Sequence, residues 1–562
     1  MILLLEKAKT GLKTAYQKDY IKTLFIFLLF FACFSLIYFS LDKFISLDDP
    51  FFHIRFVEIF RQNGMGAFSD FHWLYFSKIS DHQSYFIYYN FLFYLALIPF
   101  ALIKPLFLGM KLCGVTFAAL SFTGLYYFLL KIKEKNAFFW IMFLFGIINY
   151  SIIARFLTVR PFVLAPVLLI LLLYFLTQKK YWLIFALTVV YFFWHTATFF
   201  FPLFVAVIYA GFENFYGKKP DWKPVIFSLA GIAVSFVATL FFAPGLFVFM
   251  KDIIFGVLFD TITGTGAKLA EGAELYSANV FDFFKSSVFI IALLSVAASF
   301  EVIYYIERKR RGEIVDENIA FNQILRSTLF FLSIFFLLGT FLTKRNGDFF
   351  AFFSATYIVV TFGAFARSID FKFFLMKKAI GYGLVIVTIF FSVGNFLFIH
   401  DQIASNNDYK AIQGAAEWLK NNTERGEVVF NSTWNWFTLL FFYNTHNNYI
   451  AGIEPRFLYD YSPVLYWKWW HISNDGFLCE QENCDALKYN KKRNFRNEEK
   501  KKEWIKVEGN KIAGSILADF KSKYVITSKD FINLNEIMNN SDRFEKVYTD
   551  DIYNYHFVYK VK

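Results

Sequence analysis

The sequence predicts a polytopic α-helical membrane protein with a mixed α/β domain at its C-terminus. Of the 562 residues, 57% are hydrophobic and only 18% are charged, which is far from the composition of a water-soluble chain. Apolar runs long enough to cross roughly 30 Å of hydrocarbon recur from residue 21 to about residue 400. The remaining residues hold no such run. We therefore divide the chain into a membrane domain, 1–400, and a soluble domain, 401–562.

Basic clusters orient the spans, because Lys and Arg collect in cytoplasmic loops. Such clusters lie at 7–22, 131–135, 179–180, 218–223, 308–311 and 367–378. Keeping all of them inside requires an odd number of crossings before residue 43 and an even number between successive clusters. About eleven spans satisfy this condition: 21–42, 105–130, 137–154, 161–177, 181–195, 197–213, 224–244, 284–306, 327–343, 349–366 and 379–399.

The apolar stretch 84–103 would break this parity if it crossed, so we interpret it as a re-entrant or interfacial helix on the outer side. The N-terminus is then cytoplasmic. The first outer loop, 43–83, a late outer loop, 244–283, and the soluble domain face outward from the cell (inner) membrane. The first run has no small-residue cleavage site after it, so we expect it to stay as a span.

Two turns that we place outside contain Lys and Arg, although the positive-inside rule favours these residues in cytoplasmic loops. "ARFLTVRPF" holds Arg155 and Arg160, and "TKRNGD" holds Lys344 and Arg345. Such cations snorkel toward lipid headgroups, pair with the protein's own acids, or bind a phosphate. We take all four as candidate phosphate ligands. The net charge of +12 comes largely from loop residues and indicates membrane topology rather than a nucleic-acid partner.

The first outer loop opens with "LDDPFFHIRFVE", in which Asp48 and Asp49 precede Pro50. A carboxylate here can accept a proton from an acceptor, and we take Asp49 as the candidate base with Asp48 beside it. Both acids also suit the N-cap of a helix that begins at Pro50. The i, i+4 spacing places His53 on the helix face of Asp49, and Arg55 follows it.

Further along the same loop, "SDHQSY" contains Asp81 and His82. Asp81 is a candidate second acid and His82 a candidate donor to sugar or phosphate; simple capping or interfacial placement is the alternative.

The segment "LDDPFFHIRFVE" resembles the first-outer-loop signature of the GT-C superfamily of membrane glycosyltransferases. It is most similar to the Asp-Pro-aromatic-aromatic-x-x-Arg segment of oligosaccharyltransferase catalytic subunits. The resemblance implies a polyprenyl-phosphate or polyprenyl-pyrophosphate sugar donor and transfer, at the outer membrane face, to a glycan or protein acceptor. It places Asp49 on the family's catalytic or metal-binding aspartate and Arg345 on the residue that meets the donor phosphate.

The late outer loop contains "TGTGAKLAEGAELYS", whose Gly-rich composition predicts a mobile segment that orders over substrate. The corresponding family loop supplies a glutamate. By position, the resemblance implies Glu274 or Glu271.

Two family motifs are missing. The second outer turn of the oligosaccharyltransferases carries an Asp-x-Asp pair for Mg²⁺ or Mn²⁺, whereas "RFLTVRPF" contains no acid. Asp49 would be the ligand if a metal binds, and Arg155 or Arg160 would otherwise replace its charge. In place of the Trp-Trp-Asp-x-Gly motif for the acceptor peptide, the chain has Trp434 and Trp436 without the aspartate and glycine.

In the soluble domain, alternating patterns predict a sheet flanked by helices: "DYKAIQGAAEWLKNN", "FTLLFFYN" and "GSILADF" as helices, "EVVF", "NYIAG" and "KYVITS" as strands, and "RFEKVYTD" with "YNYHFVYKV" as a hairpin. An aromatic segment within it makes Arg456, Asp460 and Trp467 candidates for an acceptor groove, or else part of a core or interfacial belt. Cys479 and Cys484 suit a disulfide, since a zinc site would need two further ligands.

The sequence therefore predicts an inverting membrane glycosyltransferase that uses an aspartate base and a lipid-linked donor. Two alternatives stay open: an oligosaccharyltransferase that glycosylates protein asparagine, and a lipid-linked glycan carrier or flippase. ATP-driven transport has no support, because no phosphate-binding loop appears.

Overall fold

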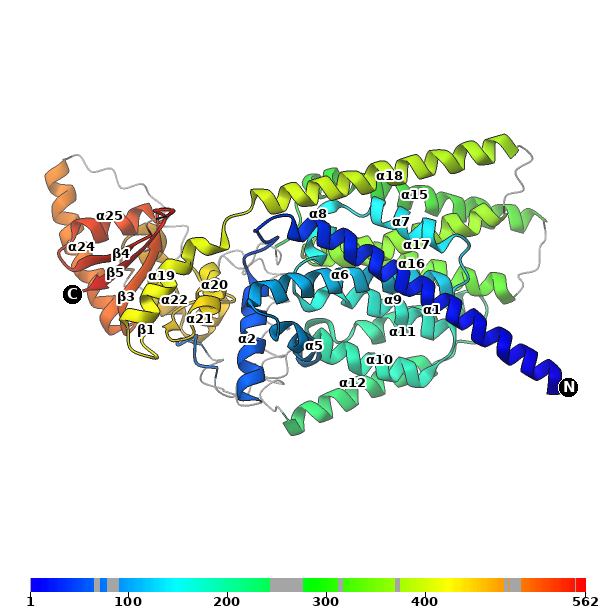
Figure 1. Ribbon diagram of the computed structural model, residues 1–562, viewed down its shortest axis with the longest axis horizontal. Helices are drawn as coiled ribbons and strands as arrows, with labels where there is room; N and C mark the ends of the chain where they lie inside the picture. The colour runs from blue at the N-terminus through cyan, green and yellow to red at the C-terminus, as the bar shows by residue number, and fades with distance from the viewer. Residues whose placement is uncertain are drawn as a thin grey trace.

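The computed structural model describes residues 2–64, 71–77, 90–242, 276–311, 317–368, 374–479, 484, 497–550 and 552–562. A long helical bundle carries a small domain at one end, and the N-terminus lies at the opposite end (Figure 1). We call the end of the bundle next to the small domain the domain end. Helix α18 (Phe374–Ser405) runs along the bundle and leads into the small domain (Figure 1).

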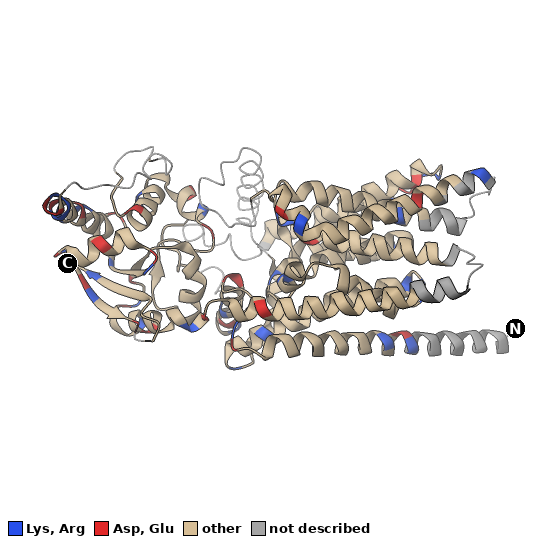
Figure 2. Ribbon diagram, turned by 90° about the horizontal axis from the view of Figure 1, so that it is seen from above, with Lys and Arg blue, Asp and Glu red and all other residues tan. Residues whose placement is uncertain are grey.

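Among the described residues, eight helical segments are long and apolar enough to cross a membrane, so the chain is a multi-pass membrane protein. The charged residues of the bundle lie toward its two ends (Figure 2). The eight segments lie in α1 (Ile2–Phe39), α6 (Leu106–Lys131), α11 (Phe201–Phe215) with the preceding turn η2 (Thr196–Thr198), α12 (Lys223–Phe242), α15 (Val280–Arg311), α16 (Glu317–Thr340), α17 (Asn346–Ser368) and α18 (Phe374–Ser405). Each of the eleven predicted ranges contains helix, while the count of eleven crossings and their direction stay predictions.

Shorter apolar helices complete the bundle. They are α5 (Phe91–Ala101), α7 (Ala137–Ile147), α8 (Tyr150–Phe156), α9 (Ala165–Thr177) with the turn η1 (Pro161–Val163), and α10 (Tyr181–Trp194). Helix α5 is the described helix of the apolar stretch 84–103, whose placement as a re-entrant or interfacial helix stays a prediction.

The predicted span 137–154 is not one straight helix, because α7 and α8 meet at an angle of 105°. The break leaves the last carbonyls of α7 without helical partners. Asn395 of α18 satisfies them: its buried amide donates to the carbonyls of Phe145, Gly146 and Ile148 at 2.9, 3.2 and 3.0 Å. A side chain nearly 250 residues away thus stabilises the bend.

Two lysines fix the chain where it leaves the bundle at the domain end. Lys111 of α6 is buried and donates to the carbonyls of Tyr38 and Leu41, at the end of α1, at 3.0 and 2.6 Å. Lys43 donates to the carbonyls of Ala404 and Asn406, at the end of α18, at 2.7 Å each. Each lysine donates two hydrogen bonds to carbonyls at a helix end, and these bonds fix the segment that leads to Asp49.

Helix α2 (Asp49–Asn63) lies across the domain end of the bundle (Figure 1). Its aromatic residues Phe51, Phe52 and Phe56 are buried. They pack between the bundle and the small domain, which explains why a helix outside the membrane spans is so rich in phenylalanine.

The small domain is a mixed sheet with helices, as predicted. Strand order is β2-β1-β3-β5-β4; β1 runs parallel to β2 and β3, and β5 antiparallel to β3 and β4. The elements are η5 (Tyr409–Ile412), α19 (Gln413–Asn422), β1 (Val428–Asn431), η6 (Trp434–Trp436), α20 (Phe437–Tyr443), β2 (Asn448–Tyr449), α21 (Arg456–Tyr461), α22 (Pro463–Asp475), α24 (Glu498–Ala518), β3 (Ser522–Ser528), α25 (Ile532–Asn540), β4 (Phe544–Thr549) and β5 (His556–Val561).

Residues 71–77 extend this sheet beyond β2. Tyr75 donates its amide to the carbonyl of Tyr449 at 3.0 Å, and Tyr449 donates to the carbonyl of Trp73 at 2.8 Å. The Trp73 indole also donates to the carbonyl of Thr445 at 2.9 Å. The segment that follows α2 is therefore part of the small domain's edge.

Asn431, at the end of β1, organises the turn before α20. Its fully buried amide donates to the carbonyls of Thr433 and Ala451 and accepts from the amides of Ile450 and Ala451.

We expect Asn431→Ala to lower the free energy of unfolding by about 2–3 kcal/mol, because several buried backbone groups lose their partners. Thermal unfolding in detergent measures this. Asn435→Ala, at an exposed position nearby, is the matched control and should change little.

Candidate active site

Asp49 is the first residue of α2, and Asp48 occupies the N-cap position. The Asp48 carboxylate makes no capping bond to the helix; it accepts from the Ser46 hydroxyl at 3.1 Å. Asp48 is exposed, whereas Asp49 is half-buried at the N-terminus of the helix. Simple capping therefore does not account for the pair of acids.

Asp49 forms an ion pair with Arg160 across 3.1 Å. The Arg160 side chain is only 13% exposed and that of Asp49 33%, so the contact is shielded but open to solvent on one side. Arg160 is extended and directly precedes Pro161, whose carbonyl accepts from the Trp194 indole at 2.7 Å. The turn that carries Arg160 is thus held by the end of α10.

Arg155 has a different partner. It donates to both carboxylate oxygens of Asp348 at 3.0–3.2 Å and lies 4.9 Å from the centre of the Phe162 ring. The Asp348 side chain is only 5% exposed and sits in the first turn of α17. This bidentate pair engages Nε and one terminal nitrogen of the guanidinium, which gives Arg155 a structural role, while phosphate binding by its remaining donors stays a prediction.

Lys344 and Arg345 directly precede α17 and are both exposed. The Lys344 amide donates to the carbonyl of Tyr276 at 3.0 Å, which fixes the turn. His195, in the turn between α10 and η2, packs against Phe349 of α17, four residues after Arg345, with ring centres 6.4 Å apart.

These turns are linked at the domain end. Arg160 pairs with Asp49, the neighbouring Pro161 accepts from Trp194, and the next residue, His195, packs against Phe349 of α17. The start of α5 joins them, because Asn90 exchanges two hydrogen bonds with Thr196 at 3.1 and 2.9 Å. The start of α17, which follows Lys344 and Arg345, thus neighbours the turn after α10, while a site shared by Asp49 and Arg345 stays a prediction.

His53 lies beneath Asp49 in an aromatic setting. Its Nδ1 is 3.2 Å from the Tyr94 hydroxyl, and its ring packs edge-on against Phe93. Burial lowers the pKa of His53 to about 4, against the opposing influence of Asp49. His53 therefore supports the site as a neutral side chain. Because the unfolded imidazole takes up a proton first, His53 favours unfolding as the pH falls from about 6.5 to 4.

Arg55 faces the small domain instead. It donates to the carbonyl of Phe442 at 2.6 Å and pairs with Glu58, which also binds Lys104. This cluster ties α2 to α20, so Arg55 positions the helix rather than the substrate.

The predicted acceptor residues divide into two groups. Trp434 and Trp436 form the turn before α20, where the Thr438 hydroxyl donates to the carbonyl of Leu47 at 3.1 Å. That turn therefore lies close to Asp49. Arg456 and Asp460, in contrast, pair with each other within α21 at 3.1 Å.

Trp467 of α22 packs beside Cys479 and Cys484, which form the predicted disulfide. The predicted residues Asp81, His82, Glu271 and Glu274, with most of the late outer loop, lie outside the described residues.

The described residues around Asp49 offer a cation rather than further metal ligands, and metal binding there stays a prediction. Arg160 forms an ion pair with the Asp49 carboxylate, and Asp348 forms one with Arg155. Within the described parts of the chain, the only cluster of three or more close His, Cys, Asp or Glu ligands is His471 with Cys479 and Cys484, in the small domain. Hard cations need several oxygen ligands, and this arrangement gives Asp49 a cationic neighbour instead.

No protein-family model matches this sequence, and no curated protein matches it. The functional argument therefore depends on the geometry of the site.

The Arg155–Asp348 pair can be tested as a structural unit. We expect Arg155→Gln and Asp348→Asn each to lower the free energy of unfolding by about 1–3 kcal/mol, discounted for the partial exposure of Arg155. The double variant should cost little more than either single one, because both changes break the same contact. Thermal unfolding of the four proteins measures the coupling, and strictly additive losses would contradict it.

Proposed function

We propose that this protein is a GT-C-type membrane glycosyltransferase that transfers a sugar, with inversion, from a polyprenyl-phosphate or polyprenyl-pyrophosphate donor at the outer membrane face. The observation that carries the proposal is the Asp49–Arg160 ion pair at the domain end of the bundle. It joins a carboxylate that can act as a base to a guanidinium that can hold a phosphate.

In the proposed reaction, Asp49 accepts the proton of the acceptor group as that group attacks the anomeric carbon. The bond from the anomeric carbon to the phosphate oxygen breaks, and the departing phosphate keeps the electron pair. Arg160, Arg345 and Lys344 stabilise the negative charge that develops on it. A lipid phosphate leaves readily once its charge is neutralised, so one positioned base suffices.

Arg160 has two roles in this scheme. When no donor is bound, Arg160 neutralises Asp49. When a donor binds, its phosphate can pair with the Arg160 guanidinium beside the base. The fixed positive charge of Arg160 also serves where the related enzymes are expected to use a metal ion. The proposal therefore requires no metal at Asp49.

Asp49→Asn tests the base. We expect sugar transfer from a radiolabelled polyprenyl-linked donor to fall by about 10²- to 10⁴-fold, while donor binding is largely retained. Asp48→Asn is the matched control, since it removes the adjacent exposed carboxylate and should leave most of the activity. An Asp49→Asn protein that transfers sugar normally would disprove the proposal. Lipid movement that persists in Asp49→Asn, in a protein whose wild type shows no transfer activity, would indicate a carrier.

Metal removal tests the role of Arg160. Because a guanidinium stands beside Asp49, we expect transfer to continue at an undiminished rate after EDTA treatment. Added Mg²⁺ or Mn²⁺ should not raise it. The same assay with an asparagine-containing peptide separates the rival function: glycosylated peptide formed only with Mn²⁺ would establish an oligosaccharyltransferase and overturn the metal-free scheme.

A further inference from the structure

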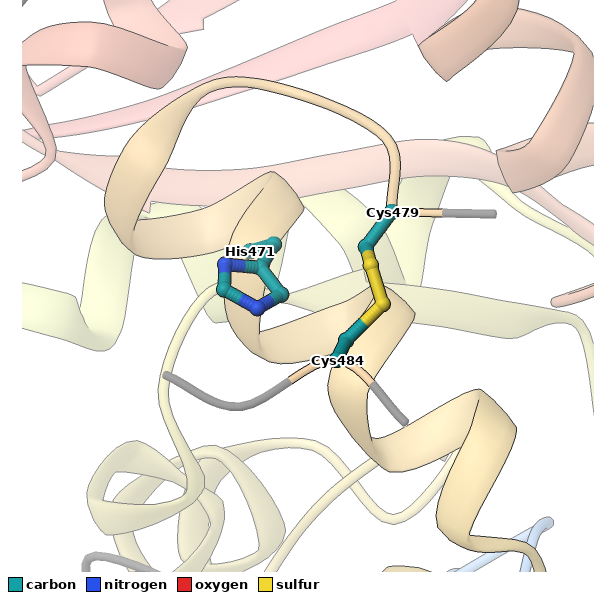
Figure 3. A group of neighbouring side chains, drawn as sticks. All are labelled: His471, Cys479 and Cys484. Carbon is teal, nitrogen blue, oxygen red and sulfur yellow. A yellow bond between two sulfur atoms is a disulfide. The ribbon is translucent and has the colours of Figure 1, made fainter. Parts of the chain in front are cut away.

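A buried histidine lies beside the disulfide of the small domain. His471 of α22 and the sulfurs of Cys479 and Cys484 place one ligand atom each within 4.8 Å of one another (Figure 3). All three residues are buried, with exposed fractions of 0%, 3% and 1%. The sequence alone offered only the two cysteines; the fold adds a third ligand from the preceding helix.

The orientation of His471 suits metal binding. Its Nδ1 is 2.7 Å from a carboxylate oxygen of Asp475, one helical turn further on. This contact favours the tautomer with the proton on Nδ1 and the lone pair on Nε2, which is the tautomer that a metal-binding histidine adopts when its Nδ1 bonds a carboxylate. Metal-binding histidines almost always have such a carboxylate or carbonyl partner on the second nitrogen.

The surrounding structure holds these groups in place. Gly476, with φ of 64°, ends α22 in the left-handed conformation and turns the chain toward Cys479. The Leu478 amide donates to buried Glu508 of α24 at 2.6 Å. Trp467 and Trp504 cover the cluster. A disulfide needs no imidazole–carboxylate pair beside it, and burying such a pair costs free energy.

We propose that His471, Cys479 and Cys484 form a zinc site when the disulfide is reduced. A dithiol reductant converts Cys479 and Cys484 to two thiols and is itself oxidised to a disulfide; zinc binding then releases the two thiol protons. Tetrahedral Zn²⁺ separates its sulfur and nitrogen ligands by roughly 3.5–3.8 Å, so small side-chain rotations suffice. Water completes the fourth position. The disulfide links Cys479 to Cys484 in the oxidised domain, and the metal links them in the reduced domain.

The test uses the full-length protein in detergent. The protein is treated with a phosphine, which reduces the disulfide and becomes the phosphine oxide with an oxygen from water. It is then equilibrated with Zn²⁺, desalted and analysed for metal content. We expect one zinc per chain after reduction and none without it. A Cys33→Ser/Cys113→Ser variant, which lacks the two free cysteines, should bind zinc as the wild type does.

Two further variants decide the outcome. Cys479→Ser/Cys484→Ser should retain no zinc, and reduced wild type that holds no more zinc than this variant would overturn the proposal. Because that variant also loses the disulfide and with it a constraint on the fold, Asp475→Asn provides a second measurement with all three ligands intact. It should weaken zinc affinity by about 10- to 100-fold. Unchanged affinity in Asp475→Asn would show that zinc binds elsewhere.

Discussion

The candidate site depends on one ion pair between segments that the chain brings together from different parts of the bundle. Asp49 belongs to the helix that crosses the domain end, and Arg160 belongs to the turn before α9. Neither position is stabilised by the pair alone. Lys111 and Lys43 secure the chain that leads to Asp49, and Trp194 secures the turn that carries Arg160. Two polar networks thus converge on a single carboxylate–guanidinium contact.

The charged residues at the domain end differ in their partners and in their exposure to solvent. Arg155 and Asp348 neutralise each other in a largely buried contact, and Arg160 neutralises Asp49 in a more open one. Lys344 and Arg345 are exposed just before α17. In the proposed scheme, an anion that binds beside Asp49 meets Arg160, which must exchange one negative partner for another. The ion pair would then make the availability of Asp49 as a base depend on the charge of the ligand.

Much of the fold follows from local pattern, whereas the pairings at the site do not. The apolar runs and the strand and helix patterns of the small domain predicted elements that the structure contains, because periodicity and span length are local properties. The ion pair of Asp49 joins residues more than a hundred positions apart, and the bend at residue 148 depends on Asn395. His195 and Asp348 carried no motif; an acid three residues after Arg345 was the one available signal.

Helix α2 joins the small domain to the bundle and carries Asp49 between them. On one side, residues 71–77 pair with β2, Arg55 binds a carbonyl of α20, and Thr438 binds the carbonyl of Leu47. On the other side, His53 packs against Phe93 and Tyr94 of α5, and Glu58 pairs with Lys104. Asp49 is therefore fixed from both sides, so its contact with Arg160 depends on the packing of α2 against the bundle as much as on the small domain.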